Sequence, residues 1–316
     1  MAMQLVGYIA LFIVSLLVLL KASDWFIDSA EEIGRSLGIS PFIIGVTIVA
    51  CGTSLPELAT SVAAVLAGNS EIVIGNVVGS NITNIALVLG LVAWVSKEIK
   101  LDYNIWHIDM PYLWGSAFLL YFAVSDLHVS LFEAFIFLAG TGIFLAYSFT
   151  VGDEDGDDET PEIVKASPKS YVMLLVGGVL VWLGADYTIM AISKLSAMAG
   201  ISPEVIALTV VALGTSLPEV IVSIGAAKKG KTSIAVGNVL GSNIFNTYIV
   251  VSIARFFGDL KIPADILNLS LPLMVAMTIL FGMVSNNKKI TRWEGVMLLL
   301  FYVFFIGNTL QPLFTE

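Results

Sequence analysis

The chain has 316 residues, of which 57% are hydrophobic and 13% are charged. Soluble domains carry about 25% charged residues, so this composition excludes an ordinary soluble protein and favours one that crosses a membrane repeatedly. The net charge of −10 says little about partners, because much of it comes from one acidic cluster, and the single cysteine, Cys51, excludes an intramolecular disulfide.

Ten apolar segments follow one another along the chain, and the fourth is the shortest. The first contains the run Leu5–Leu20, which lacks the basic start and the small-residue cleavage site of a signal peptide, so we expect a spanning helix there. The expected spans are 4–27, 41–67, 71–95, 108–125, 130–150, 170–193, 204–227, 232–257, 266–285 and 293–312.

The second half of the sequence repeats the first. The motif Gly-Thr-Ser-Leu-Pro-Glu occurs at Gly52–Glu57 and at Gly214–Glu219, and 219 − 57 gives an offset of 162 residues. The same offset aligns Asp24 with Asp186 and Gly79-Ser80-Asn81-Ile82 with Gly241-Ser242-Asn243-Ile244. Each half holds five spans, an odd number, so the second half must enter the membrane in the opposite sense.

These patterns predict an all-α integral membrane protein with ten transmembrane helices in two inverted-topology five-helix repeats. The first repeat is expected at 1–150, an acidic linker at 151–169 and the second repeat at 170–316. The cell membrane is the expected location.

Basic residues in the loops predict the orientation. If the N-terminus lies outside, the inside loops carry eleven lysine and arginine residues, whereas the outside loops carry only Lys194, Arg255 and Lys261. Both termini are therefore expected outside and the linker in the cytoplasm. The inside set is Arg35, Lys97, Lys100, Lys165, Lys169, Lys228, Lys229, Lys231, Lys288, Lys289 and Arg292.

The linker is rich in acids between Asp153 and Glu162. Gly156 is the fourth residue from Asp153, whereas an EF-hand loop needs its glycine at the sixth position. A solvated hinge is the favoured interpretation, and weak calcium sensing is the alternative.

The repeated motif places a proline and a carboxylate inside an apolar segment. Pro56 and Pro218 each collide with the carbonyl four residues back, so breaks are expected near Ala50–Ser54 and near Ala212–Ser216. Freed carbonyls in hydrocarbon need a partner, and a cation can serve. The hydroxyls of Thr53, Ser54, Thr215 and Ser216 add hard oxygen ligands beside Glu57 and Glu219.

Polar side chains line the third and eighth spans at intervals of four residues. Asn76, Ser80 and Asn84 share one helix face, and Asn238, Ser242 and Asn246 repeat it. The resulting oxygen-only set suits Na⁺ or Ca²⁺ rather than zinc or copper. Glycines beside these residues (Gly75, Gly79, Gly237, Gly241) predict close helix approach.

Other polar residues have simpler interpretations. A single intramembrane Glu could be a structural hydrogen-bond partner, but two copies at a constant offset favour an ion pathway. Asn81 and Asn243 lie one position off the polar face and favour interhelical packing. Asp24 and Asp186 are interpreted as interfacial, Cys51 as an apolar filler, and Trp25, Trp106, Trp182 and Trp293 as interfacial anchors.

Charge arithmetic favours antiport. Two neighbouring carboxylates do not both stay ionised without a cation, one Ca²⁺ neutralises both, and at least two monovalent cations or protons must replace it. A doubly negative site without ions is too costly to reorient across the membrane.

At these residues the chain resembles the sodium/calcium exchanger family of the cation/Ca²⁺ antiporter superfamily, over essentially its whole length. The resemblance implies electrogenic exchange of three Na⁺ for one Ca²⁺, with spans one and six as sliding gate helices. It implies that Glu57 and Glu219 ligate Ca²⁺ with the carbonyls of Thr53 and Thr215. It implies two Na⁺ sites related by the repeat. The first consists of Ser80, Thr215, Ser216, Glu57 and the Ala212 carbonyl, and its mirror site consists of Ser242, Thr53, Ser54, Glu219 and the Ala50 carbonyl. It also implies that Asn84 and Asn246 flank the centre.

The residue at position 246 bears on coupling. Potassium-dependent members of the superfamily carry an aspartate there, so Asn246 favours K⁺-independent exchange. Proton/calcium exchangers typically replace the Thr-Ser-Leu-Pro run, which leaves H⁺/Ca²⁺ antiport as the alternative, with a passive cation channel behind it. No catalytic residues or cofactor are expected, only the ions and the bilayer; no nucleic-acid or protein partner is indicated, which is compatible with a monomer.

Overall fold

A computed structural model describes residues 2–101, 105–106, 109–151, 165–199 and 214–311, and they are overwhelmingly helical. Within these ranges, eight helical stretches are long and apolar enough to cross a membrane. Two expected spans fall outside that set. The fourth is a helix of only 15 residues, Asp109–Ala123, and the seventh begins in a part of the chain that the structure does not describe. The prediction of a helical, multi-span membrane protein is confirmed.

The first half contains five spans, three of them built from one continuous segment each. Its second span joins α2, a π-helical turn η1 and α3, and its third joins α4, η2 and α5. The bounds are α1 Ala2–Ser36, α2 Pro41–Ile44, η1 Gly45–Val49, α3 Ala50–Leu66, α4 Glu71–Ile82, η2 Thr83–Leu89, α5 Gly90–Ser96, α6 Asp109–Ala123 and α7 Leu131–Val151.

The second half follows the same plan. The equivalent of the third span joins α12, η4 and α13, and the equivalent of the fourth joins η5 and α14. The bounds are α8 Pro168–Met198, α11 Leu217–Lys228, α12 Thr232–Phe245, η4 Asn246–Val250, α13 Val251–Phe257, η5 Ile266–Ser270, α14 Leu271–Ser285 and α15 Arg292–Leu310.

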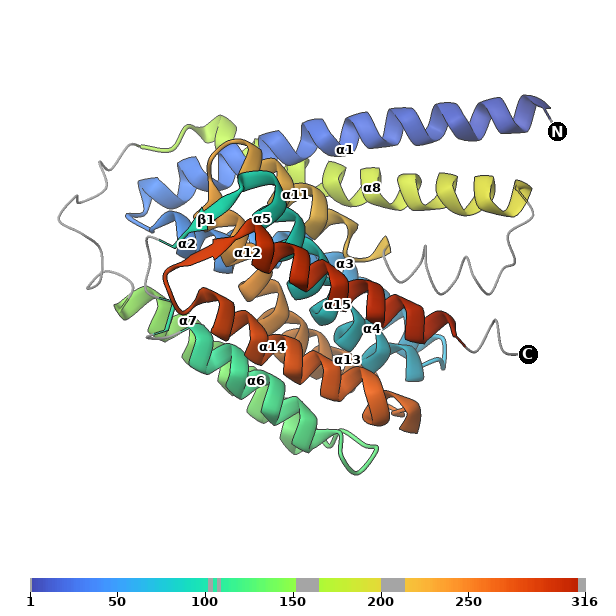
Figure 1. Cartoon of the computed structure of the whole chain (residues 1–316), viewed down its shortest axis with the longest axis vertical. Coiled ribbons are helices and arrows are strands. Elements are labelled where there is room, and N and C mark those ends of the chain that lie inside the picture. Colours follow the sequence, from blue (N-terminus) through green and yellow to red (C-terminus); the bar gives the residue numbers. More distant parts are fainter. Residues whose placement is uncertain (1, 102–104, 107–108, 152–164, 200–213, 312–316) are drawn as a thin grey trace.

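The first helices of the two halves, α1 and α8, lie side by side and run in opposite directions (Figure 1). Their contact is close because glycines of α8 face α1. A Cβ on Gly177 would lie 3.1 Å from the backbone nitrogen of Phe26, and a Cβ on Gly184 would lie 3.0 Å from the Cα of Leu19. Such packing joins α1 and α8 into one unit along the side of the protein.

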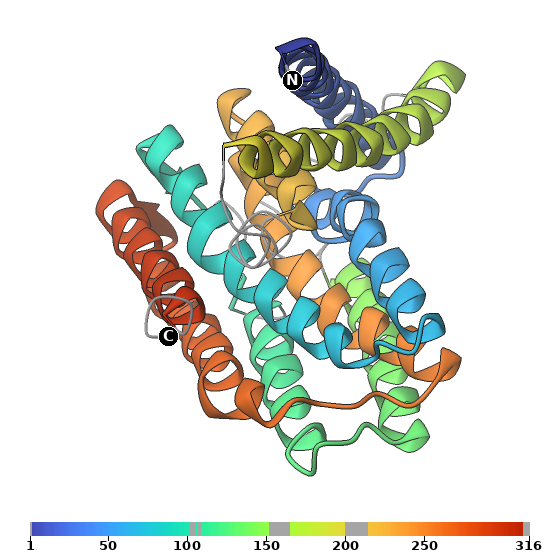
Figure 2. The ribbon, with the colours of Figure 1, turned by 90° about the vertical axis from the view of Figure 1, so that its right-hand side faces the viewer.

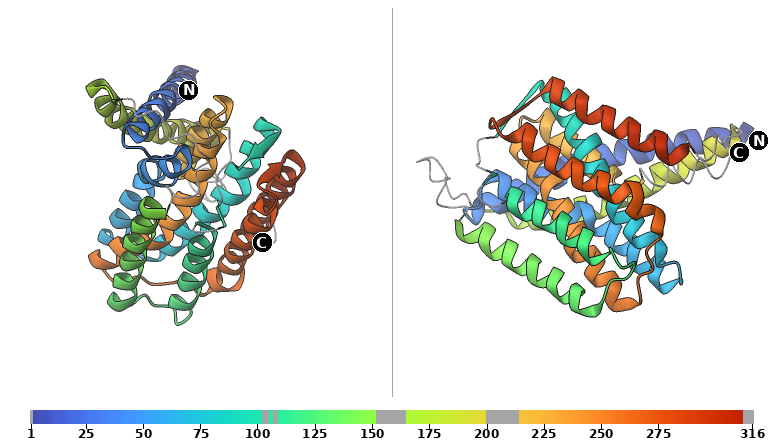
Figure 3. Two further views of the ribbon diagram at one scale, coloured as in Figure 1. Left: turned by 90° about the vertical axis from the view of Figure 1, so that its left-hand side faces the viewer. Right: turned by 60° about the horizontal axis from the view of Figure 1, so that its bottom comes forward.

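The helices that carry the repeated motifs form the centre of the protein. The most buried spans are Thr232–Phe257, Glu71–Ser96 and Pro41–Leu66. Helices α6 and α7 lie at the end opposite the α1–α8 pair, and α15 covers one flank (Figures 2 and 3). Polar side chains of the two motifs are therefore enclosed by helices on several sides.

A short two-stranded ribbon interrupts the helical fold, and His128 and Lys261 form an isolated antiparallel bridge elsewhere. Strand β1, Glu98–Lys100, pairs antiparallel with β2, Lys289–Thr291. The ribbon ties the end of α5 to the start of α15, where Thr291 and Glu294 form a reciprocal capping box. Strands of three residues carry too little alternation to be recognised in a sequence.

Candidate functional site

The two copies of the motif have different backbones. Helix α3 runs without interruption through Pro56, and the irregular turn lies one turn earlier, at η1 (Gly45–Val49). The predicted break at Ala50–Ser54 is therefore wrong by about one turn: the helix keeps its geometry there although Pro56 cannot donate to the Gly52 carbonyl, and the irregular turn lies upstream. In the second copy, Thr215 and Ser216 form a turn and α11 begins at Leu217.

A second pair of π-helical turns marks the third and eighth spans. Asn84 lies in η2 (Thr83–Leu89), and Asn246 begins η4 (Asn246–Val250). Because π-helical turns re-aim side chains and recur at functional sites, their place at two equivalent asparagines directs both amides to one region. No pattern in the sequence predicts these turns.

The two motif glutamates are fully buried and belong to the same site. Glu57 and Glu219 are each 0% exposed, and their carboxylates are close enough to interact electrostatically. Ser54, one turn before Glu57, donates a hydrogen bond to Oε1 of Glu219 at 3.2 Å. The inverted repeats thus bring two acidic groups together in the interior, as the sequence predicts.

Threonines of the motifs contact asparagines of the opposite repeat. Oγ1 of Thr53 donates to Oδ1 of Asn238 at 3.0 Å and lies 3.4 Å from Oγ of Ser242. Oγ1 of Thr215 donates to Oδ1 of Asn76 at 3.2 Å and lies 3.4 Å from Oγ of Ser80. Two pseudo-symmetric networks therefore cross the interface between repeats.

Two serines that the sequence analysis missed complete these networks. Nδ2 of Asn238 donates to Ser223 at 2.9 Å, and Nδ2 of Asn76 donates to Ser61 at 3.2 Å. Each serine stands four residues after a motif glutamate and they are 162 residues apart, so extending the repeat alignment by one helical turn would have found them. They fix which way each amide faces, with the oxygen toward the threonine.

Asn81 and Asn243 pack the repeats against each other, as the sequence analysis predicts. Nδ2 of Asn81 donates to Thr247 at 2.9 Å and to the carbonyl of Asn243 at 3.4 Å, and Asn243 returns a bond to the carbonyl of Asn81 at 3.3 Å. Their side-chain oxygens accept from Asn246 at 3.3 Å and from Asn84 at 3.1 Å. These bonds use the NH₂ groups of Asn84 and Asn246 and leave both amide oxygens available.

Six buried oxygen atoms of this centre have no hydrogen-bond partner in the described part of the chain. They are Oε1 and Oε2 of Glu57, Oε2 of Glu219, Oδ1 of Asn84, Oδ1 of Asn246 and Oγ of Ser216. Unpartnered buried acceptors are rare and costly, and five of these six are carboxylate or amide oxygens. Such a set fits hard cations.

Glycines allow two helix backbones to approach each other closely in one half of this centre. A Cβ on Gly241 would overlap the backbone carbonyl of Val46 in η1, and a Cβ on Gly237 would overlap that of Phe42. Their counterparts differ, because a Cβ on Gly79 would meet no described atom within 4 Å and one on Gly75 would meet only Ile266, at 3.6 Å. The predicted close approach is confirmed at Gly237 and Gly241 and not at Gly75 and Gly79.

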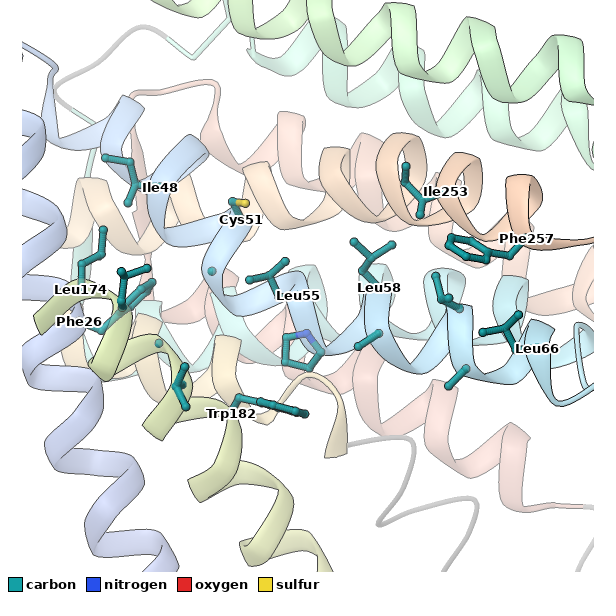
Figure 4. Close-up of a pocket in the computed structure, with 18 residues that line it drawn as sticks. Phe26, Ile48, Cys51, Leu55, Leu58, Leu66, Leu174, Trp182, Ile253 and Phe257 are labelled. Atoms are coloured by element: carbon teal, nitrogen blue, oxygen red, sulfur yellow. The ribbon is translucent and has the colours of Figure 1, made fainter. Parts of the chain in front are cut away.

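An apolar groove near this centre is distinct from the candidate ion site. It has a volume of about 700 Å³, lies between α3, α8 and α13, and is lined by side chains such as Leu55, Leu58 and Phe257 (Figure 4). The free thiol of Cys51 opens onto it rather than filling a core position. Trp182 and the motif proline Pro56 both line this groove and also a smaller cavity beside it.

The centre gathers nearly all the predicted site residues. Among the described residues, no group of three or more His, Cys, Asp or Glu side chains is placed to bind a metal, so a cation here would depend on two carboxylates with amide, hydroxyl and carbonyl oxygens. Ala212 lies outside the described residues. Those in the centre are Ala50, Thr53, Ser54, Glu57, Ser80, Asn84, Thr215, Ser216, Glu219, Ser242 and Asn246, all buried except the half-buried Thr215.

Comparisons with known proteins agree with this geometry. The family described as sodium/calcium exchanger protein matches residues 7–150 and 169–310. The chain is 33% identical to the sodium/calcium exchanger MaX1 of Methanosarcina acetivorans, over 94% of this chain and 96% of that protein. It is 35% identical to an uncharacterized membrane protein of Methanocaldococcus jannaschii, over 96% and 97% of the two chains. A solved structure of the sodium-calcium exchanger NCX_Mj, soaked with Na⁺ and Sr²⁺, superposes with a TM-score of 0.83 at 34% identity, over 97% of this chain and 99% of that one.

Proposed function

Because the chain belongs to the sodium/calcium exchanger family, we propose that it is a secondary active antiporter that exchanges Na⁺ for Ca²⁺ by alternating access. The observation that carries the proposal is the meeting of Glu57 and Glu219 in a buried centre with unpartnered oxygen acceptors. The proposal needs no catalytic residue and no cofactor, and the ions are the substrates.

In this proposal Glu57 and Glu219 bind Ca²⁺ between them, with the carbonyls of Thr53 and Thr215 as further ligands. Both glutamates offer carboxylate oxygens that accept no hydrogen bond within the described residues. Asn84 and Asn246 flank the ion, and their amide oxygens are likewise unpartnered.

Two Na⁺ sites related by the repeat would lie beside the Ca²⁺ site. The first consists of Ser80, Thr215, Ser216, Glu57 and the Ala212 carbonyl; the second consists of Ser242, Thr53, Ser54, Glu219 and the Ala50 carbonyl. Short contacts within these sets support the grouping: Ser80 to Thr215 and Ser242 to Thr53 at 3.4 Å, and Ser54 to Glu219 at 3.2 Å.

Charge balance makes the proposed exchange electrogenic. Two ionised glutamates give the centre a charge of −2, one Ca²⁺ brings it to 0, and three Na⁺ bring it to +1. With Asn246 in place of an aspartate there is no third carboxylate to favour K⁺. We therefore propose a stoichiometry of three Na⁺ to one Ca²⁺, independent of K⁺.

We place both termini outside the cell membrane and the acidic linker in the cytoplasm. The repeats would extend over 1–150 and 170–316, with the linker at 151–169. This orientation rests on the loop charges, and Figure 1 is compatible with it, because α7 ends and α8 begins at the side of the protein remote from the start of α1 and the end of α15. The α1–α8 pair would slide as the gate.

The experiment that tests the function is a flux assay in vesicles that contain the purified protein. Uptake of ⁴⁵Ca²⁺ is measured while Na⁺, K⁺ and pH gradients are imposed one at a time, and a membrane-potential dye reports charge movement. Antiport predicts uptake driven by an outward Na⁺ gradient, unchanged by K⁺ and accompanied by net charge. Uptake driven only by a pH gradient would replace it with H⁺/Ca²⁺ antiport, and Ca²⁺ flux without any counter-ion would replace it with a channel.

A further inference from the structure

Asp24 and Asp186 occupy equivalent positions in the two repeats, yet the structure gives them opposite surroundings. They are 162 residues apart, one on α1 and the other on α8. The sequence alone assigns both to the membrane interface. Their difference indicates which carboxylate a passing cation can reach.

Asp24 is neutralised by a cluster of charges at the linker end of α1. Nζ of Lys229 lies 3.0 Å from its carboxylate and 2.9 Å from that of Asp28. Lys231 lies 2.6 Å from both Asp28 and Glu31. Burial alone would lower the pKa of Lys231, but hydrogen bonds and charges of Asp28 and Glu31 outweigh burial and raise that pKa, so the lysine stays charged.

Asp186 has no such partners. In the described residues no lysine or arginine forms an ion pair with it, and the first-repeat equivalents of Lys229 and Lys231 are Ala67 and Asn69. It lines a cavity of about 190 Å³ between α8, α3 and the start of α11. An ionised carboxylate in an apolar 31-residue helix is costly against lipid, so a cavity that can hold several waters is the environment that suits it.

This cavity leads from Asp186 to the ion-binding centre. Thr60 lines its wall, and Gly214, Thr215 and Pro218 of the second motif line its inner side. Oγ1 of Thr215 contacts both Asn76 and Ser80 at the centre. One small cavity therefore places an unpaired carboxylate and a member of the proposed Na⁺ site on the same path.

We propose that Asp186 recruits cations at the mouth of the access route, binding them in transit before they reach Glu57 and Glu219. This inference rests on the proposed function. A fixed negative charge at the exposed edge of an open cavity raises the local concentration of cations and their rate of entry, and salt screens that effect. Asp186 therefore acts on apparent affinity, whereas the two glutamates hold the ion that is exchanged.

The test is Asp186→Asn, with Ca²⁺ added on the side of the termini and uptake measured as a function of its concentration. We expect the half-saturating Ca²⁺ concentration to rise about 3- to 10-fold at low ionic strength, with a maximal rate close to that of the wild type. The rise should shrink when about 0.5 M choline chloride is added, and Asp186→Glu should restore the wild-type value.

Asp265→Asn is the matched control, because Asp265 is an exposed carboxylate on the same side in the proposed topology and does not line the cavity. It removes the same charge and should leave the half-saturating concentration unchanged. An unchanged value in Asp186→Asn, a loss confined to the maximal rate, or an equal defect in Asp186→Glu would overturn the inference. The wild-type protein in the same assay tests the proposed function separately, since its failure to couple Ca²⁺ to Na⁺ would not depend on Asp186.

Discussion

Ser54, from the first repeat, donates a hydrogen bond to the carboxylate of Glu219, from the second, whereas the hydroxyl of the equivalent Ser216 makes no hydrogen bond to a described residue. Inverted repeats place equivalent residues in similar positions, but in any one conformation of a transporter the hydrogen bonds of the two equivalents can differ. The two serines therefore allow structural and ion-binding roles to be separated.

Substitution of either serine by alanine should weaken Na⁺ dependence in the same way, but only the Ser54 substitution should lower the stability of the protein. Ser54→Ala removes a bond to a buried carboxylate and should lower the stability of the Na⁺-free protein by about 1.5 kcal/mol or more, whereas Ser216→Ala removes no bond. Both should raise the half-saturating Na⁺ concentration if both hydroxyls bind Na⁺. Thermal unfolding in detergent and Na⁺-dependent Ca²⁺ flux measure the two effects, and equal stability with unequal Na⁺ dependence would contradict this assignment.

Removing either central charge should abolish exchange. Glu57→Gln and Glu219→Gln keep the shape of the side chain but leave one carboxylate, so a divalent cation is no longer neutralised and its affinity should fall by about 100-fold or more. The readouts are ⁴⁵Ca²⁺ binding to the purified protein and vesicle flux. Glu71→Gln, at an exposed position in the first turn of α4, is the matched control and should exchange normally. Near-normal Ca²⁺ binding by either central variant would remove the site assignment.

Much of this centre is predictable from the sequence because most site residues occur twice, at equivalent positions in the two repeats. The constant offset selects Glu57 and Glu219 and places them in opposite halves, and hydrophobicity alone locates the spans. The turns at η1, η2 and η4 are not predictable in this way, because a π-helical turn adds one residue without changing the apolar character of the segment.

The different surroundings of equivalent residues are also beyond the sequence. Asp24 and Asp186 occupy equivalent positions, and the repeat alignment shows lysines at 229 and 231 where the first repeat has Ala67 and Asn69, but only the three-dimensional structure shows that Lys229 pairs with Asp24. The hydrogen bonds of Ser61 and Ser223 depend similarly on which face of α3 and α11 meets the neighbouring span. Such differences are set by tertiary packing rather than by local sequence.

A glycine pair tests the close approach of the repeats. Gly241→Ala would push a methyl group into the backbone carbonyl of Val46, which cannot move aside as a flexible side chain can. We expect α12 to separate from η1, with a loss of stability of about 1–3 kcal/mol and a strong loss of exchange. Gly79→Ala is the equivalent change in the first repeat, where the added methyl meets no described atom within 4 Å. It should be tolerated, and equal thermal stability of the two variants would show that the contact at Val46 is not limiting.

The ionic cluster at the linker end of α1 should hold this end of the helix against the loop between α11 and α12. Lys231→Gln removes two ion pairs, to Asp28 and Glu31, while Lys228→Gln removes a neighbouring charge that forms no ion pair with a described residue. Because the pairs are partly exposed, their combined contribution should be on the order of 1–2 kcal/mol. Hydrogen exchange of peptides covering residues 22–36 should therefore speed up in Lys231→Gln and not in Lys228→Gln.

The pH dependence of this cluster follows from the raised pKa of Lys231. A group whose pKa is higher in the folded state contributes its full stability below its unfolded pKa and loses it only as pH rises through the folded value. An ordinary lysine already titrates near 10.4, so the contribution should be constant between about pH 6 and pH 9. After correction for intrinsic exchange rates, the protection that Lys231 gives to α1 should be flat over this range. Protection that disappears by pH 9 would mean that a group other than Lys231 holds the helix in place.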